Sequence, residues 1–197
     1  MTKRPMTASG GSTAGWTVLG YLGLAGFFAA EAALRRPGSA ASLDASEGDR
    51  DTTRQIGRAY LAAATLPLVL SPAQPRLSRA VAPAGLALEA SGLGLRLWSM
   101  ATLGAAYTRT LRTEAEQQVV DAGPYRVVRH PGYLGSLLIW LGFGLTTRRL
   151  PVVVGVGVLV GRAYQRRIGA EEDLLGRDLP GYADYAQRTK RLIPFVW

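Results

Sequence analysis

Twelve residues near the middle of the chain hold most of the side chains that could do chemistry. Residues 122–133, AGPYRVVRHPGY, include the single histidine of the chain, His130, with two arginines and two tyrosines. Gly123-Pro124 and Pro131-Gly132 are turn signals, because proline fixes φ and glycine tolerates positive φ. The stretch is therefore either a ligand-binding site or a folded cationic turn at a membrane face.

A second polar stretch, RIGAEEDLL at residues 167–175, favours the binding site. In a helix, Arg167 and Glu171 are four residues apart and share one face. The residues between the two stretches are apolar enough for a hairpin, which would bring both polar ends together. Arginine can hold a carboxylate or phosphate in a bidentate fork, and glutamate can hold a cationic amine or a ribose hydroxyl. The pattern predicts a pocket for a polar cofactor and a lipid-like substrate.

The composition argues against several other chemistries. The chain has no cysteine, which excludes disulfides and thiolate nucleophiles. A zinc site built around one histidine would need several grouped carboxylates, and none are grouped in that way. The sequence shows no Ser/His/Asp set and no phosphate-binding GxxxxGK loop, and Gly92-Leu-Gly94 lacks the context of a dinucleotide fold. We expect no metal.

The chain is strongly basic, with a formal net charge of +9 from 23 basic and 14 acidic residues. The basic residues fall between apolar runs, as they do in the loops of membrane proteins. They form no single patch and no stacked aromatic platform, which argues against nucleic-acid binding. Mean hydropathy is only +0.09, because arginine-rich loops and a Gly/Ala-rich composition dilute the average.

Five apolar runs must position the two polar stretches. They cover residues 15–34, 56–70, 81–106, 133–145 and 150–160. A run of twenty residues at about 1.5 Å per residue spans a bilayer core of about 30 Å. The leader, residues 1–14, has a basic start typical of a signal peptide, but the run after it is too long for one. We predict an all-α fold, an integral membrane bundle of about five transmembrane helices with a C-terminal cytosolic helical segment.

The predicted organisation has three parts. A flexible leader (1–14) precedes three transmembrane helices (15–106) and a catalytic, cofactor-binding region (107–197), which holds the helical hairpin 133–160 and C-terminal amphipathic helices. Glu89 and Arg96 are seven residues apart on one face of the third run, as a neutralising pair or as ligands. Residues 188–191, with Trp197, predict a segment at the lipid headgroups. The positive-inside rule favours a cytosolic C-terminus in the cell inner membrane, with both polar stretches facing the cytosol.

Five motifs of the second half together resemble a known family. They are LRLWSMATLG (95–104), YTRTLRT (107–113), GPYRVVRHPGYLG (123–135), RIGAEEDLL (167–175) and YADYAQRTKRLIP (182–194). The pattern is similar to that of the isoprenylcysteine carboxyl methyltransferase family, part of a wider group that includes membrane phospholipid N-methyltransferases. The resemblance covers residues 93–197, and the first two apolar runs carry no signature of it.

The resemblance implies a membrane methyltransferase that uses S-adenosylmethionine and acts on the carboxylate of an isoprenylcysteine-type or other small hydrophobic acceptor. Arg167 would address that carboxylate, and Arg167 and Glu171 would be the catalytic residues. Gln117 stands where relatives often have histidine. A carboxylate needs no general base to attack a methyl group on a sulfonium, so His130 is expected to be a cofactor ligand or pocket wall. The implied cofactor-binding residues are Gln117, Gln118, Val119, Val120, Tyr125, His130, Pro131, Gly132, Tyr133, Glu171 and Glu172.

Three other functions stay open at this stage. A phospholipid N-methyltransferase would use the same cofactor on an amine, and a base would then matter more. A membrane reductase of related architecture would bind NADPH and would also need basic residues for its phosphate. A non-catalytic membrane protein would use its basic loops to bind anionic lipid.

Overall fold

The computed structural model describes residues 13–33, 51–70, 76–104 and 118–194, and these residues form helices and turns without a strand. The all-α prediction is therefore confirmed for this part of the chain. The elements are α1 (Thr13–Ala33), α2 (Thr52–Val69), α3 (Val81–Leu103), the 3-10 turn η2 (Gly123–Arg126), α4 (Pro131–Thr146), α5 (Leu150–Asp178) and α6 (Tyr182–Arg188).

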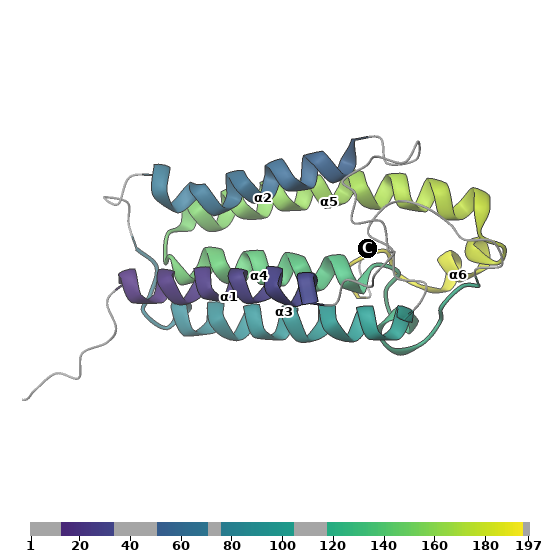
Figure 1. Cartoon of the computed structure of the whole chain (residues 1–197), viewed down its shortest axis with the longest axis horizontal. Coiled ribbons are helices and arrows are strands. Elements are labelled where there is room, and N and C mark those ends of the chain that lie inside the picture. The colour runs from purple at the N-terminus through teal and green to yellow at the C-terminus, as the bar shows by residue number, and fades with distance from the viewer. Residues whose placement is uncertain (1–12, 34–50, 71–75, 105–117, 195–197) are drawn as a thin grey trace, which may run out of the picture.

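The long helices form two layers. Helix α2 packs against α5 in one layer, and α1 and α3 pack against α4 in the other (Figure 1). Contacts between α4 and α5 join the layers. The turn between α4 and α5 lies at the same end of the bundle as the start of α1, and α6 lies at the opposite end (Figure 1). The two polar stretches found in the sequence belong to the end that carries α6.

The described parts of the predicted apolar runs lie mostly within helices, but the structure does not establish five membrane spans. Within the described residues, α1 is the one helix long and apolar enough to cross a membrane by itself, and α4 is a shorter apolar helix. Helix α5 continues without a break through the apolar run into the polar stretch at 167–175. This continuity fixes where the polar side chains of α5 lie relative to the bundle.

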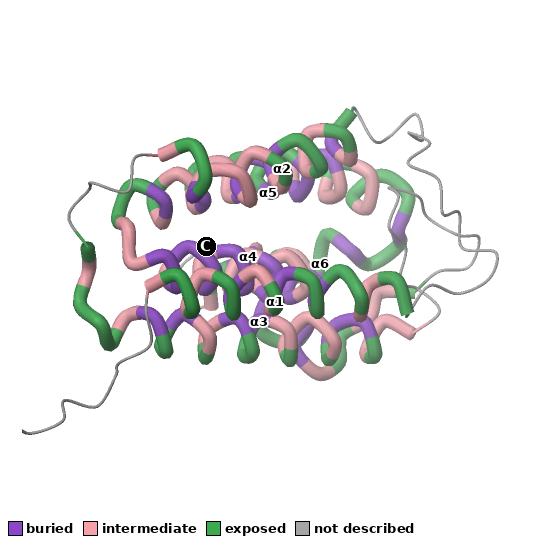
Figure 2. Tube along the Cα trace, turned by 60° about the vertical axis from the view of Figure 1, so that its left-hand side comes forward, coloured by how far each residue is buried: buried purple, intermediate pink, exposed green. Residues whose placement is uncertain are grey.

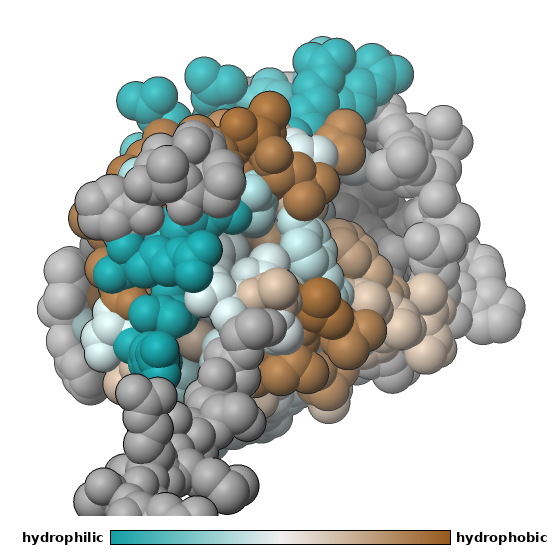
Figure 3. All heavy atoms as spheres, turned by 90° about the vertical axis from the view of Figure 1, so that its left-hand side faces the viewer, coloured by the Kyte–Doolittle hydropathy of each residue, from teal (hydrophilic) through white to brown (hydrophobic). Residues whose placement is uncertain are grey.

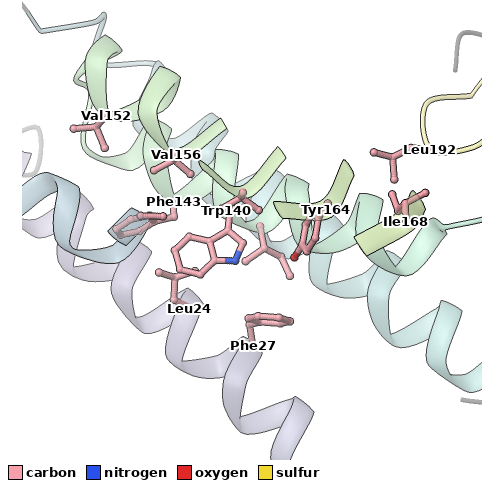
Figure 4. Packing of buried hydrophobic residues seen from close by; sticks show 12 residues of the cluster. Leu24, Phe27, Trp140, Phe143, Val152, Val156, Tyr164, Ile168 and Leu192 are labelled. Atoms are coloured by element: carbon pink, nitrogen blue, oxygen red, sulfur yellow. The ribbon is translucent and has the colours of Figure 1, made fainter. Parts of the chain in front are cut away.

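The core of the bundle is built around α4. This helix carries a long series of buried residues (Figure 2), because other helices cover it on several sides. Trp140 and Phe143 of α4 point toward Leu24 and Phe27 of α1, and Tyr164 of α5 lies beside them (Figure 4). Trp140 and Phe143 are fully buried. Large aromatic side chains thus fill the space between the two layers.

Glycines set the register between α3 and α4. A β-carbon added at Gly92 would lie 2.5 Å from the carbonyl oxygen of Gly135, and one at Gly85 would lie 2.6 Å from that of Gly142. Helix backbones can approach this closely only where side chains are absent. Gly85 and Gly92 are seven residues apart on α3, and Gly135 and Gly142 are seven residues apart on α4. Because the two helices run antiparallel, both glycines of α3 face a glycine of α4. The register brings Arg96 next to the start of α4, where its Nη1 donates to the carbonyl of Gly132 at 3.1 Å.

The expected pairing of Glu89 with Arg96 is wrong. Arg96 Nε instead lies 2.7 Å from Glu31 Oε1, at the end of α1. Residues seven apart on a helix share a face but are separated by about 10 Å along the axis, which is too far for direct contact. The carboxylate of Glu89 is buried and faces Gly23 of α1. Its two oxygens have no hydrogen-bond partner within the described residues.

Candidate active site

The two polar stretches meet at a tyrosine hydroxyl. Tyr133 lies in the first turn of α4, and its hydroxyl donates to Glu171 Oε2 at 2.7 Å and accepts from Arg167 Nε at 3.1 Å. Pro131 begins α4, a position that suits proline because the first helical N–H has no partner inside the helix. The predicted meeting of these stretches is therefore confirmed, and Tyr133 is the residue that joins them.

A third element completes the surroundings of Arg167. Its Nη1 donates to the hydroxyls of Thr52, at 2.9 Å, and Thr53, at 3.1 Å, in the first turn of α2. Arg167 is only 3% exposed. Sequence analysis did not single out these threonines, because two adjacent hydroxyls at a helix start are usually part of a cap. Helix α2 thus contributes directly to the polar group at the site.

Glu172 contacts two arginine side chains and one histidine side chain. Its Oε1 lies 2.8 Å from Arg129 Nε and 3.1 Å from His130 Nε2, and its Oε2 contacts Arg191. Burial favours the protonated carboxyl, but hydrogen bonds from His130, Arg129 and Arg191 outweigh that effect and lower the pKa of Glu172 to about 2. The carboxylate is therefore ionised at neutral pH. It links α5 to the turn before α4 and to the segment after α6.

The C-terminal segment is tied to the site through its backbone. Arg129 N–H donates to the carbonyl of Lys190 at 2.7 Å, and His130 N–H donates to that of Arg191 at 3.1 Å. The side chain of Arg129 also donates to the carbonyl of Ala186 at 2.8 Å. Lys190 and Arg191 belong to the segment expected at the lipid headgroups, and their backbone pairs with the turn before α4. Trp197 lies outside the described residues.

The remaining predicted site residues lie in different surroundings. Gln117 lies outside the described residues, and Gln118 is exposed. Val119 packs against an apolar cluster formed by Leu179, Tyr182 and Tyr185, and Val120 is half-buried beside it in sequence. Tyr125 is buried, and its carbonyl accepts from the Tyr185 hydroxyl at 2.7 Å. The structure therefore brings Arg167, Tyr133 and Glu171 together, with His130 and Glu172 adjoining, whereas Val119 and Tyr125 join the cluster around α6.

Two polar groups at the site have spare hydrogen-bonding capacity. Among the described residues, Tyr133 is the hydrogen-bond partner of Glu171, and it engages one of the two carboxylate oxygens. The buried hydroxyl of Tyr182 has no partner in the same part of the chain. Burial, and next the charge of Glu172, raise the pKa of Tyr182, so that its hydroxyl stays protonated. A carboxylate oxygen and a phenol suit a ligand that carries ammonium or hydroxyl groups.

Comparison with known proteins finds a match for the segment that carries Tyr133, Arg167 and Glu171. Residues 85–177 match the model of the isoprenylcysteine carboxyl methyltransferase (ICMT) family. The match includes α3, α4 and all of the α5 residues discussed above. It excludes α1 and α2, and with them Thr52 and Thr53. The polar group around Arg167 therefore combines residues inside and outside the matched segment.

Several known proteins align with about half of this chain. The chain is 30% identical over 118 residues to a probable protein-S-isoprenylcysteine O-methyltransferase of Oryza sativa subsp. indica, covering 57% of this chain and 60% of that protein. It is 32% identical over 118 residues to protein-S-isoprenylcysteine O-methyltransferase B of Arabidopsis thaliana, covering 57% and 58%. It is 32% identical over 103 residues to the cobalt-zinc-cadmium resistance protein CzcN of Cupriavidus metallidurans, covering 52% and 48%. The aligned part thus spans less than two thirds of each relative.

Proposed function

We propose that this chain, whose residues 85–177 match the model of the isoprenylcysteine carboxyl methyltransferase family, is a membrane methyltransferase of that family that uses S-adenosylmethionine and acts on the carboxylate of a lipid-like acceptor. The observation that carries the proposal is the hydroxyl of Tyr133, which joins Arg167 to Glu171. An anion-binding guanidinium and a cation-binding carboxylate thus lie on either side of one phenol. The relatives named as protein-S-isoprenylcysteine O-methyltransferases support the carboxylate as the acceptor group.

The residues near Glu171 fit an S-adenosylmethionine site. When bound, S-adenosylmethionine supplies a methyl group that its sulfonium has already activated. The second carboxylate oxygen of Glu171 would accept from an ammonium or a ribose hydroxyl, and the Tyr182 hydroxyl would offer another polar contact. His130 is buried and would form a wall of the pocket. Glu172 would keep His130 in place through the contact at 3.1 Å.

Arg167 would hold the carboxylate of the acceptor. The planar fork of its guanidinium matches the two oxygens of a carboxylate. Thr52, Thr53 and Tyr133 fix its orientation through neutral hydroxyls. The ionised carboxylate is itself the nucleophile, so the residues of the site need only orient it and exclude water. No protein group has to remove a proton.

The same arrangement favours a carboxylate over an amine acceptor. A protonated amine would be repelled by Arg167 and would have to lose a proton before attack. A carboxylate that is already ionised needs no such step. O-methylation therefore needs fewer additional groups than N-methylation at this site.

We further propose that the five long helices cross the membrane, with the site at its cytosolic face. Large apolar side chains are exposed on the outer faces of three of them: Leu22 is 61% exposed on α1, Leu61 68% on α2 and Val154 54% on α5. Helices of 18 to 23 residues, such as α1, α2 and α3, are about 27–35 Å long, close to the thickness of a bilayer core. A lipid-like acceptor would thus reach the site from the bilayer.

Calorimetric titration of the detergent-purified protein with S-adenosylhomocysteine tests the cofactor. We expect saturable binding by the wild type, at least a tenfold loss of affinity in Glu171→Ala, and unchanged affinity in Asp178→Ala. The last variant removes an exposed acid from the end of the same helix. A folded wild type that binds NADPH instead would refute the proposal and favour a reductase.

Methyl transfer to an S-prenylated, N-acetylated cysteine tests the acceptor. We expect transfer from radiolabelled S-adenosylmethionine to the free carboxylate and none to the same compound with its carboxylate already esterified. Arg167→Gln is expected to abolish transfer and to retain binding of S-adenosylhomocysteine. Transfer to a phosphatidylethanolamine amine, without transfer to the prenylcysteine, would contradict the assigned acceptor.

A further inference from the structure

The end of the bundle opposite the candidate active site collects uncompensated positive charge. Arg76 and Arg79 precede α3, and Arg148 and Arg149 form the turn between α4 and α5. The sequence on either side of these arginines is free of acids over long distances, since residues 52–88 and 122–170 contain neither aspartate nor glutamate. No ion pair joins these four arginines to a carboxylate within the described residues. The charge of this end is therefore available to an anion from outside.

Two of these arginines converge on one hydroxyl. Arg76 Nη1 lies 3.1 Å and Arg148 Nη1 3.4 Å from Thr13 Oγ1, in the first turn of α1. A hydroxyl can accept both hydrogen bonds, but it does not neutralise either guanidinium. Its own proton remains available for donation. Two guanidinium groups and a hydroxyl donor in one place are a set suited to the oxygens of a phosphate.

The backbone around these arginines is held firmly in place. The N–H of Leu77 donates to the carbonyl of Arg148 at 2.7 Å, and Arg148 Nη2 donates back to the carbonyl of Leu77 at 2.7 Å. Arg148 has a φ of 57°, a left-handed conformation that non-glycine residues seldom adopt. Arg149 donates to the carbonyls of Pro67 and Leu70 at the end of α2. These contacts fix the position of the turn, and with it the side chain of Arg148.

Apolar surface adjoins the arginines. Leu68 and Val69, at the end of α2, are each 77% exposed, and Leu150, next to Arg149, is 54% exposed. This end of the molecule shows hydrophilic residues beside hydrophobic ones (Figure 3). A free phosphate would make no use of the apolar side chains, whereas a phospholipid would place its phosphate at the arginines and its acyl chains along the leucines and valine.

We propose that Arg76, Arg148 and Thr13 bind the phosphate of an anionic phospholipid at the bundle end opposite the candidate active site. The net negative headgroup would neutralise the arginines of the α4–α5 turn. The acyl chains would cover the exposed side chains of Leu68, Val69 and Leu150. This inference rests on charge and exposure at this end of the bundle and is independent of methyl transfer at the other.

Native mass spectrometry of the full chain in detergent, with added phosphatidylglycerol or phosphatidylcholine, tests the site. We expect the wild type to retain phosphatidylglycerol at least several-fold better than phosphatidylcholine. Arg76→Gln should weaken retention of phosphatidylglycerol about tenfold, because Arg76 is exposed and its removal leaves the backbone contacts of the turn intact. The matched control Arg58→Gln removes an exposed arginine of α2 outside this cluster and should bind like the wild type.

Three results would overturn the proposal. One is equal retention of the two lipids by the wild type. Another is an Arg76→Gln variant that binds phosphatidylglycerol as the wild type does, or a loss of equal size in Arg58→Gln. The third is binding of inorganic phosphate, lost in Arg76→Gln, without retention of phosphatidylglycerol, which would assign the arginines to a free anion. Arg148→Gln provides a second variant, and its thermal unfolding shows whether any loss of lipid follows from a loss of fold.

Discussion

Arg167 Nη1 donates to the hydroxyl of Thr52, 2.9 Å away and 115 positions earlier in the chain. Arg167 lies within the segment matched by the methyltransferase family, and Thr52 lies outside it. The first turn of α2 therefore orients Arg167, a residue of the matched segment 85–177. Because the Thr53 hydroxyl binds the same nitrogen, the two threonines restrict the guanidinium to one orientation.

Replacing both threonines by valine should weaken recognition of the acceptor. In Thr52→Val/Thr53→Val, Arg167 loses two hydrogen bonds but keeps its charge. Hydrogen bonds to charged groups contribute about 1.5–3 kcal/mol, so we expect KM for a prenylcysteine acceptor to rise roughly tenfold or more, with kcat less affected. Steady-state kinetics measure KM and kcat separately. Thr52→Ser/Thr53→Ser should restore KM, and an unchanged KM in the valine variant would refute a positioning role.

Tyr133→Phe should separate Arg167 from Glu171 while leaving the helices in place. The change removes a hydroxyl that serves both residues. We expect kcat/KM for methyl transfer to fall by about 10- to 100-fold, because both charged groups lose the contact that orients them. Tyr21→Phe is the matched control, since its part-buried hydroxyl donates to the carbonyl of Ala64 at 2.7 Å, away from the site. A comparable loss of activity in both variants would contradict the specific role of Tyr133.

The sequence predicted the meeting of the two polar stretches for a physical reason. Helical spacing places Arg167 and Glu171 on one face, and the intervening apolar residues must reverse direction to bury themselves. The partners supplied by distant elements could not be predicted in this way. Arg191 reaches Glu172 because the chain turns back after α6, and Arg96 reaches Glu31 because α1 packs beside α3. Periodicity within one helix does not show how that helix packs against another helix, nor where the chain runs after the helix ends.

The ion pairs of Glu172 should make the fold sensitive to acid. Its pKa is lowered to about 2 from an ordinary value of 4.5, so the ionised form stabilises the folded state. This stabilisation is complete above about pH 4.5 and is lost as the pH falls toward 2. After allowance for solvent screening it amounts to about 1–2 kcal/mol. Thermal unfolding in detergent between pH 3 and 6 measures it.

Glu172→Gln supplies the comparison for this pH dependence. The amide cannot ionise, so the variant should be less stable than the wild type at pH 6, and the difference should shrink toward pH 3. Asp178→Asn changes an exposed acid of the same helix. This variant should lose as much stability between pH 6 and pH 3 as the wild type does. If the stability difference between wild type and Glu172→Gln stayed constant from pH 6 to pH 3, Glu172 would not be the source of the pH dependence.

Gly92→Ala should disrupt the packing of α3 on α4. The added methyl group would lie 2.5 Å from the carbonyl oxygen of Gly135 and 2.8 Å from the backbone nitrogen of Ile139, so the helices would have to separate. Overpacking of this kind costs about 1–3 kcal/mol, and thermal unfolding should show the loss. Gly94→Ala, in the same helix, meets no atom within 4 Å and should be neutral or stabilising by about 0.5–1 kcal/mol. If both variants unfolded at the same temperature, direct contact between the backbones of α3 and α4 would be refuted. If Gly92→Ala alone were destabilised and also lost activity, the register that places Arg96 beside the start of α4 would be linked to the site.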